Sequence, residues 1–211
     1  MANDLGTMKT EVRLWFDVDD VRLADAPLER IINDVCRDLY RRGDFMFMQD
    51  TDTSLTTVSG TQAYTLPSTV GRVIGVYVTN SGDNYWLTYL DPVEFDAMYS
   101  SSTTTGSESH YTLWAGTIKI GPTPAGAYQI SILNFKYPTL LEDDTDTNTF
   151  LDRAWDVILY GTLAEVAKYL MEQDRIMEFS SEYEKRFRRF LIDQTRGYTG
   201  SSRPVSVETR F

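Results

Sequence analysis

The sequence predicts an α+β protein in which helices from both ends of the chain form a helical bundle around an inserted antiparallel β-sandwich or barrel-like unit. Near both ends, apolar residues recur every three or four positions, whereas the middle alternates in short runs rich in Thr, Tyr, Val and Gly. Neither end alone carries enough apolar surface for a core, so the two ends are expected to pack together. The predicted domains are the bundle (1–44 and 139–196), the β domain (45–138) and an extended C-terminal tail (197–211).

Two helices are predicted in the N-terminal section. Residues 7–16 suit a short helix, and a stronger one begins near Pro27, which fits a first helical turn. Gly43 is a natural stop for this second helix. Its apolar face carries Leu28, Ile31, Ile32, Val35, Leu39 and Tyr40. Cys36 lies on the same stripe and is interpreted as a small buried hydrophobe.

Short strands joined by tight turns are predicted in the middle section. Residues 128–135 alternate and indicate a last strand, residues 92–99 suit one or two helical turns, and residues 100–109 form a polar loop. The predicted hairpins pair residues 55–58 with 62–66 across Ser59–Gly60, 72–78 with 85–90 across residues 81–84, and 111–114 with 117–120 across Ala115–Gly116.

Two further helices are predicted in the C-terminal section. Thr149 followed by Asp152 resembles a capping box with Asp in place of Glu, and the apolar rhythm then continues to Leu170. Gly161 costs about 1 kcal/mol relative to Ala inside a helix, which predicts close packing of another helix at that point. The final helix is expected from Asp174 to about Thr195.

The charge is strongly acidic and unevenly distributed. A net charge of −11 argues against general DNA binding, because an acidic surface repels the phosphate backbone. Residues 185–211 nevertheless carry seven basic and two acidic side chains, a net charge of +5 against −16 for the rest. This basic tail predicts a protein partner with an acidic surface.

Few residues suit catalysis or cofactor binding. A single cysteine and a single histidine, His110, argue against cysteine or histidine chemistry and zinc. The acidic runs 50–54 and 144–148 lack the glycine and the glutamate of a calcium loop. No phosphate-binding glycine loop is present. We therefore expect no enzyme activity, no metal and no cofactor.

The sequence also bears on the cellular compartment. No run approaches the roughly 18 apolar residues of a membrane span, and the start of the chain lacks the pattern of a signal peptide. We therefore expect no membrane partner and a chain that is made, or assembled into something larger, in a cytoplasm-like compartment.

Aromatic residues gather in the β section. Trp86, Tyr89, Tyr99, Tyr111 and Trp114 suit three interpretations. They fill a small β core, because aromatics favour strands; they cover a subunit interface, where Tyr and Trp are enriched; or they form a platform for a sugar ring.

The order of several short segments resembles the adaptor, or head-to-tail connector, proteins of tailed bacteriophages over about residues 7–195. Each segment alone is a weak signal, and the shared order and spacing carry the resemblance. In chain order the segments are the helix 28–40 ending at Asp44–Phe45, then residues 64–67, 72–76, 91–96, 118–124, 137–138 and 159–167.

The resemblance implies a virion protein of the neck, assembled in the host cytoplasm as a ring, usually a dodecamer, under the portal protein. Such a ring joins the capsid to a nozzle or other tail protein, and DNA passes through it without specific binding. The C-terminal segment often reaches into the portal. The residues proposed for portal binding are Arg196, Tyr198, Arg203, Arg210 and Phe211, and those for a subunit or tail-protein interface are Trp86, Tyr89, Tyr99 and Trp114.

Two alternatives stay open. The chain could be another tail component, such as a nozzle or fibre-anchoring protein, or a carbohydrate-binding module. Glycan binding predicts exposed, coplanar tryptophans, whereas a connector predicts helix faces that become buried only in the ring.

Overall fold

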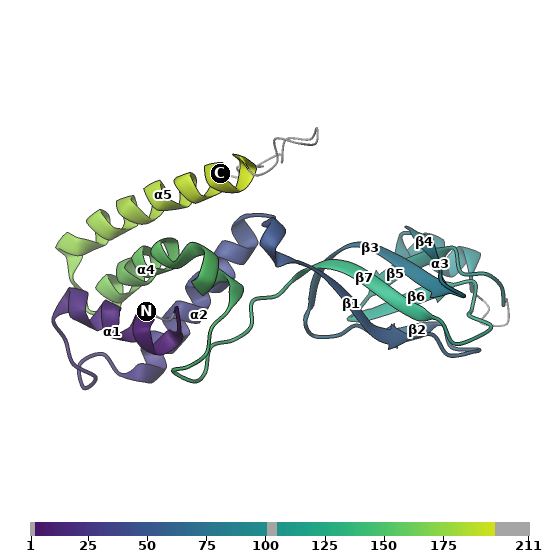
Figure 1. Cartoon of the computed structure of the whole chain (residues 1–211), viewed down its shortest axis with the longest axis horizontal. Coiled ribbons are helices and arrows are strands. Elements are labelled where there is room, and N and C mark those ends of the chain that lie inside the picture. Colours follow the sequence, from purple (N-terminus) through teal and green to yellow (C-terminus); the bar gives the residue numbers. More distant parts are fainter. Residues whose placement is uncertain (1–2, 101–104, 197–211) are drawn as a thin grey trace. The chain divides into compact units, whose positions relative to one another are not determined.

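The computed structural model describes residues 3–100 and 105–196 and confirms the α+β class. It divides into two compact units, residues 1–47 with 138–211 and residues 48–137. Figure 1 shows helices in the first and a curled sheet in the second. The helices are α1 (Leu5–Phe16), α2 (Asp25–Arg42), α3 (Pro92–Met98), α4 (Thr149–Tyr169) and α5 (Gln173–Arg196), with a short 3-10 turn at Met46–Met48. The strands are β1 (Gln49–Thr56), β2 (Ala63–Thr65), β3 (Val70–Asn80), β4 (Asp83–Tyr89), β5 (His110–Trp114), β6 (Thr117–Gly121) and β7 (Gln129–Lys136).

In the helical unit, helix α4 is the element that the other helices share. It packs against α1, α2 and α5, which explains why its sequence is apolar on most sides. Helix α5 contributes one apolar face, formed by Phe179, Tyr183, Phe187 and Phe190. The core of this unit is thus built from segments near both ends of the described chain.

The start of α4 differs from the prediction by one residue. Asn148, and not Thr149, is the N-cap, and its side-chain oxygen accepts hydrogen bonds from the N–H groups of Phe150 (3.1 Å) and Leu151 (3.0 Å). Asn is as good a cap as Thr, because its short side chain reaches the same free N–H groups. The capping box expected from Thr149 and Asp152 is therefore wrong.

Close packing at Gly161 is confirmed. A Cβ atom at this position would lie 2.8 Å from Cγ1 of Val35 on α2 and 3.0 Å from Cε2 of Tyr183 on α5. Both distances are shorter than van der Waals contact. The missing side chain therefore lets α2, α4 and α5 approach one another.

We expect Gly161→Val to lower the free energy of unfolding by about 2 kcal/mol, because overpacking a closed contact typically costs 1–3 kcal/mol. Thermal or urea unfolding followed by circular dichroism measures the loss. Glu165→Val, at an exposed position of the same helix, is the matched control and should change stability by less than about 1 kcal/mol. Equal losses in the two variants would contradict the packing role of Gly161.

The β unit is one curled sheet of seven strands in the order β1-β7-β3-β4-β5-β6-β2, a half-barrel. The barrel-like alternative of the predicted β unit agrees with this single curled sheet, but the purely antiparallel pairing is wrong in one place, since β4 and β5 run parallel. The reason is the connection between them. Helix α3 lies in the connection between them, and β5 starts at the same end of the sheet as β4.

Two of the three predicted hairpins are confirmed. The β3–β4 turn places Ser81 and Gly82 at φ 53° and 91°, and the β5–β6 turn places Ala115 and Gly116 at 47° and 75°. Positive φ at both central residues suits the twist of two-residue hairpins.

The hairpin predicted across Ser59–Gly60 is wrong. Strand β1 pairs with β7, and β2 pairs with β6 at the other edge of the sheet. Gly60 does adopt a positive φ of 78°, but its turn leads between the two edges. The turn at Gly60 was therefore predicted correctly from its residues. The strand partners were not, because they are distant in sequence.

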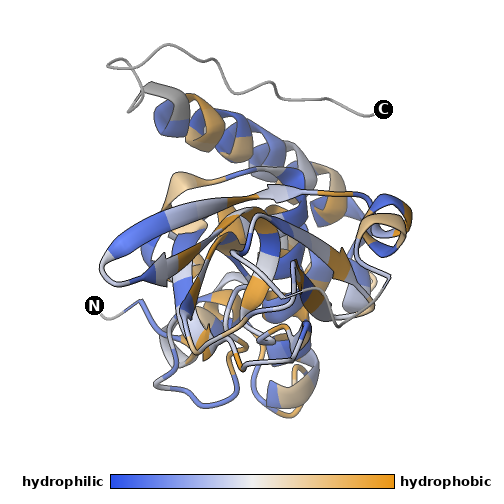
Figure 2. Cartoon of the chain, turned by 90° about the vertical axis from the view of Figure 1, so that its right-hand side faces the viewer, coloured by the Kyte–Doolittle hydropathy of each residue, from blue (hydrophilic) through white to orange (hydrophobic). Residues whose placement is uncertain are grey.

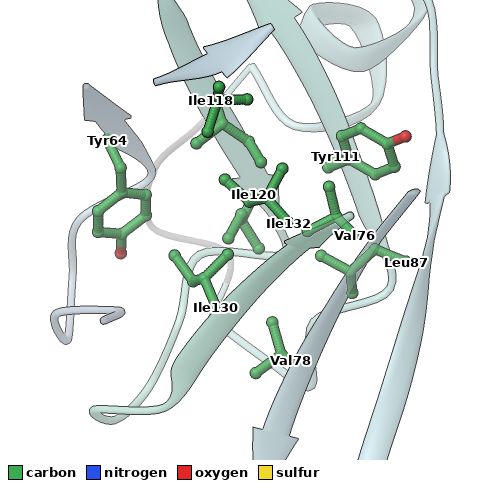
Figure 3. Close-up of a cluster of buried hydrophobic side chains, with 10 residues drawn as sticks. Tyr64, Val76, Val78, Leu87, Tyr111, Ile118, Ile120, Ile130 and Ile132 are labelled. Atoms are coloured by element: carbon green, nitrogen blue, oxygen red, sulfur yellow. The ribbon is translucent and has the colours of Figure 1, made fainter. Parts of the chain in front are cut away.

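The concave side of the sheet holds the core of the β unit. Figure 3 shows Ile118, Ile120, Ile130 and Ile132 pointing toward one another, all fully buried. The core is completed by Tyr64, Val70, Val76, Val78, Leu87 and Tyr111. Tyr111 thus fills the core, as the first interpretation of the aromatic cluster predicts.

Candidate interaction surfaces

The residues predicted to bind the portal lie at the C-terminal end of the chain. Arg196 is the last residue of α5, and its side chain is outside the described part of the structure. Tyr198, Arg203, Arg210 and Phe211 lie outside the described residues altogether. Their role stays a prediction.

Three of the four aromatic residues predicted to form an interface are exposed in the β unit. The exposed fractions are 61% for Trp86, 51% for Tyr89 and 62% for Trp114. Trp86 packs its ring over Tyr77, with 5.1 Å between centroids. It also covers Gly75, where a Cβ would lie 3.1 Å from the indole. The indole of Trp86 is therefore held in place on the sheet while most of it faces outward.

Tyr99 is placed differently from the other three. Its ring packs against Phe95 (5.1 Å between centroids) and lies so close to Gly121 that a Cβ there would be 2.5 Å away. Its hydroxyl is 2.7 Å from Nδ1 of His110, which is also 2.8 Å from the Ser109 hydroxyl. Tyr99 therefore helps to fix α3 against the sheet, and His110 has local hydrogen-bond partners.

The structure adds exposed apolar residues that the sequence analysis did not single out. Tyr85 on β4 and Val93 and Met98 on α3 all face solvent. The helical spacing of α3 could have shown this for the last two, because only Phe95 lies on its buried side. Together with Trp86, Tyr89 and Trp114 they form a set of exposed apolar side chains that take no part in the core of the β unit, which is typical of an interaction surface.

The acidic run 144–148 has structural roles. The Asp144 carboxylate pairs with Lys9 of α1, and Asp146 accepts backbone hydrogen bonds from Glu142 (2.8 Å) and Asp143 (2.9 Å). These backbone hydrogen bonds lower the pKa of Asp146. Within the described residues, no group of three or more His, Cys, Asp or Glu side chains is arranged to hold a metal ion.

Cys36 is buried, as predicted. Burial raises the pKa of its thiol to about 12, so the reactive thiolate is scarce at neutral pH. The amide nitrogen of Asn148 lies 3.9 Å from its sulfur.

A groove of about 430 Å³ opens on the helical unit between α2, α4 and α5, and we call it the acidic groove. Its floor includes Val35, Gly161 and Tyr183, the same three residues whose close approach holds the helices together. Burial is the main cause that raises the pKa of Tyr183, whose hydroxyl donates to Asp38 (3.3 Å). The floor is therefore a neutral, mainly apolar surface.

Charged side chains form the rim of the acidic groove. Arg42 bridges Asp38 (2.7 Å) and Glu184 (2.8 Å), and Lys168 pairs with Glu165 (2.6 Å). The rim also includes Asp34, so its charged residues are four carboxylates and two cations: Asp34, Asp38, Glu165, Glu184, Arg42 and Lys168. Each carboxylate is about half exposed and has room for a further partner.

None of the helices in the described ranges 3–100 and 105–196 is long and apolar enough to cross a bilayer.

Comparison with known proteins identifies the family. No curated protein matches the chain significantly. The SU10 adaptor protein family matches residues 3–208, nearly the whole sequence, and therefore includes both units. This agrees with the resemblance carried by the ordered segments from residue 28 to residue 167. The chain therefore belongs to the SU10 adaptor protein family, structural adaptors of the bacteriophage virion.

Proposed function

We propose that the protein is a head-to-tail connector that docks as a ring under the portal protein, joins the capsid to the tail and leaves a channel for DNA. The observation that carries this proposal is the family match, which spans residues 3–208. An adaptor of the virion needs partners on two sides, and the chain offers a basic tail and an exposed aromatic surface.

The helical unit is the ring-forming body in this proposal. Its acidic charge keeps DNA from adhering, because carboxylates on a channel wall repel phosphate. Ring closure then comes from contacts between unlike surfaces of neighbouring copies.

The β unit contacts a nozzle or other tail protein in this proposal. Trp86, Tyr89 and Trp114 supply the kind of exposed aromatic side chains that dominate protein interfaces. Trp86 already lies in a defined position against Gly75 and Tyr77, so little conformational entropy is lost when a partner covers it.

The tail supplies the portal contact. We expect removal of Arg196–Phe211 to leave a folded chain that no longer docks onto portal protein, because the basic side chains beyond α5 are lost. Circular dichroism and light scattering check the fold and the solution state, and a pull-down with purified portal protein checks docking.

A chain in which residues 197–211 are replaced by Gly and Ser is the matched control for length. It should fail to dock like the truncated chain. Undiminished portal binding by the truncated chain would overturn the role of the tail.

A further inference from the structure

The outer face of α5 is basic near its C-terminal half. Lys185, Arg188 and Arg189 are exposed there, and we call these three residues the basic face of α5. Helical spacing puts them opposite Phe187 and the other buried aromatics of the helix. Figure 2 shows the alternation of hydrophilic and hydrophobic bands along α5. The basic face therefore turns away from the core of its own unit.

Helix electrostatics alone do not account for this basic face. Cations stabilise the C-terminal end of a helix, but the effect fades within the last turn. Arg188 and Arg189 lie about two turns before Arg196, the last residue of α5. Lys185 pairs with Glu182 at 2.6 Å, which leaves the two arginines as the main source of positive charge.

The acidic groove carries the opposite charge. Its four rim carboxylates exceed its two cations, and both cations already have a carboxylate partner within 2.8 Å. Asp34 on α2 pairs with Arg37 at 2.9 Å and Glu165 on α4 pairs with Lys168 at 2.6 Å, and both carboxylates stay at least about half exposed. A basic helix laid over the groove would meet these carboxylates and the apolar floor at Val35 and Tyr183.

We propose that the acidic groove of one copy binds the basic face of α5 of a second copy of this chain. Within one copy the two surfaces cannot meet, because α5 is itself a wall of the groove and its basic face points outward. Each copy therefore offers one groove and one basic face, the arrangement of a heterologous contact that propagates from copy to copy. This inference rests on the proposed ring and names the surfaces that close it.

Nucleic acid is the other possible partner of a basic helix face. Two arginines and a lysine on a chain of net charge −11 provide few phosphate contacts, and phosphate contacts supply most of nonspecific affinity. The acidic groove, in contrast, offers four rim carboxylates to the three basic side chains of this face. The observations therefore favour the second copy.

Disulfide trapping tests the contact in the full chain. Chains carrying Arg188→Cys are mixed with chains carrying Glu165→Cys and oxidised, and we expect a cross-linked dimer. Cys36 stays out of the reaction because it is buried. Arg188→Cys mixed with Asp20→Cys, an exposed position in the α1–α2 connection, is the matched control and should give about tenfold less product. Equal yields in the two mixtures would overturn the proposal.

Charge reversal tests the same contact without cysteines. Sedimentation velocity at low salt should show association reduced about tenfold by Arg188→Glu with Arg189→Glu, and equally by Asp34→Lys with Glu165→Lys, because like charges then face each other. The chain that carries all four substitutions should associate again. Asp19→Lys with Asp20→Lys, the same change of charge outside the groove, should leave association unchanged.

The outcomes separate this inference from the proposed function. Failure of the fourfold variant to recover overturns the proposed contact. So does a wild-type chain that does not self-associate together with an Arg188→Cys and Glu165→Cys mixture that does not cross-link. A second outcome also overturns the proposed contact. If the Arg188→Glu, Arg189→Glu variant binds DNA less tightly than wild type but self-associates as strongly, the basic face is a nucleic-acid site. Portal binding by the wild-type chain, measured separately, still supports the connector in each case.

Discussion

Phe150→Ala is expected to lower the free energy of unfolding of the helical unit by about 3–5 kcal/mol, the range for truncating a buried phenylalanine. Phe150 is fully buried in the first turn of α4. Its ring meets Phe45 edge-on at 5.8 Å and Phe47 at 5.4 Å between centroids. Phe190 of α5 packs on Phe45 at 5.2 Å. The aromatic cluster around Phe150 therefore joins the segment after α2, the start of α4 and the C-terminal half of α5.

Tryptophan fluorescence follows both units, whereas helical circular dichroism follows mainly the helical unit. Trp15 and Trp155 lie in the helical unit, and Trp86 and Trp114 lie in the β unit. Urea unfolding of Phe150→Ala should show early loss of helical circular dichroism and a separate, later change of fluorescence from the β unit. Phe150→Leu is the conservative control and should cost less than about 1.5 kcal/mol. A loss below about 1 kcal/mol in Phe150→Ala would show that the aromatic cluster does not hold the unit together.

Phe150 also shows what the sequence could and could not predict. The helix that carries it followed from apolar spacing, as did the other long helices, and the two hairpins with positive-φ turns followed from their turn residues. Its partners did not, because Phe45 and Phe47 are more than a hundred positions away and belong to no periodic pattern. The pairing of β1 with β7 and the parallel β4–β5 pair escaped for the same reason. Local chemistry predicted elements, while distant partners fixed their arrangement.

The candidate surfaces, too, were only partly predictable from the sequence. Charge counting along the chain found the basic stretch that begins at Lys185. It did not find the acidic groove, because Asp34 and Glu165 lie far apart in sequence and share a rim only after α2 and α4 pack at Gly161. A clustering of aromatics in the β section was visible as well. Its division into an exposed Trp86 and a Tyr99 held against α3 required the fold.

Lys9→Met is expected to lower the free energy of unfolding by about 2–3 kcal/mol at neutral pH. Lys9 is only 4% exposed on α1, and its ammonium group contacts Asp144 as well as Glu29 (3.0 Å) and Asp25 (3.4 Å). Removal of a buried charge leaves its partners facing one another and typically costs 3–5 kcal/mol. The expected loss is smaller here because all three carboxylates keep some contact with solvent, which screens their repulsion.

The pH dependence of this loss has a defined sign. Burial opposes the charged form of Lys9, but hydrogen bonds to Asp144 and Glu29 outweigh it and raise the pKa of Lys9 above its usual 10.5. A raised pKa in the folded state stabilises the fold below pH 10.5, and this stabilisation is lost as pH rises through the folded-state pKa. At the acid end, a hydrogen bond from Arg13 and the charge of nearby Lys9 both lower the pKa of Asp25 below its usual 3.8, and only the part due to Lys9 is lost in Lys9→Met. Its contribution is present above that pH and is lost as pH falls through the lower folded-state value.

The stability difference between wild type and Lys9→Met should therefore be flat from about pH 6 to 9, and it should shrink above about pH 10.5 and below about pH 4. Urea unfolding across this range measures it. Lys168→Met is the matched control, because Lys168 is half exposed and pairs with the half-exposed Glu165, so its loss should stay below about 1 kcal/mol. A difference that does not vary with pH would assign the effect of Lys9 to its buried aliphatic stem, and α1 would then be joined to α2 and the 142–147 segment by packing rather than by charge.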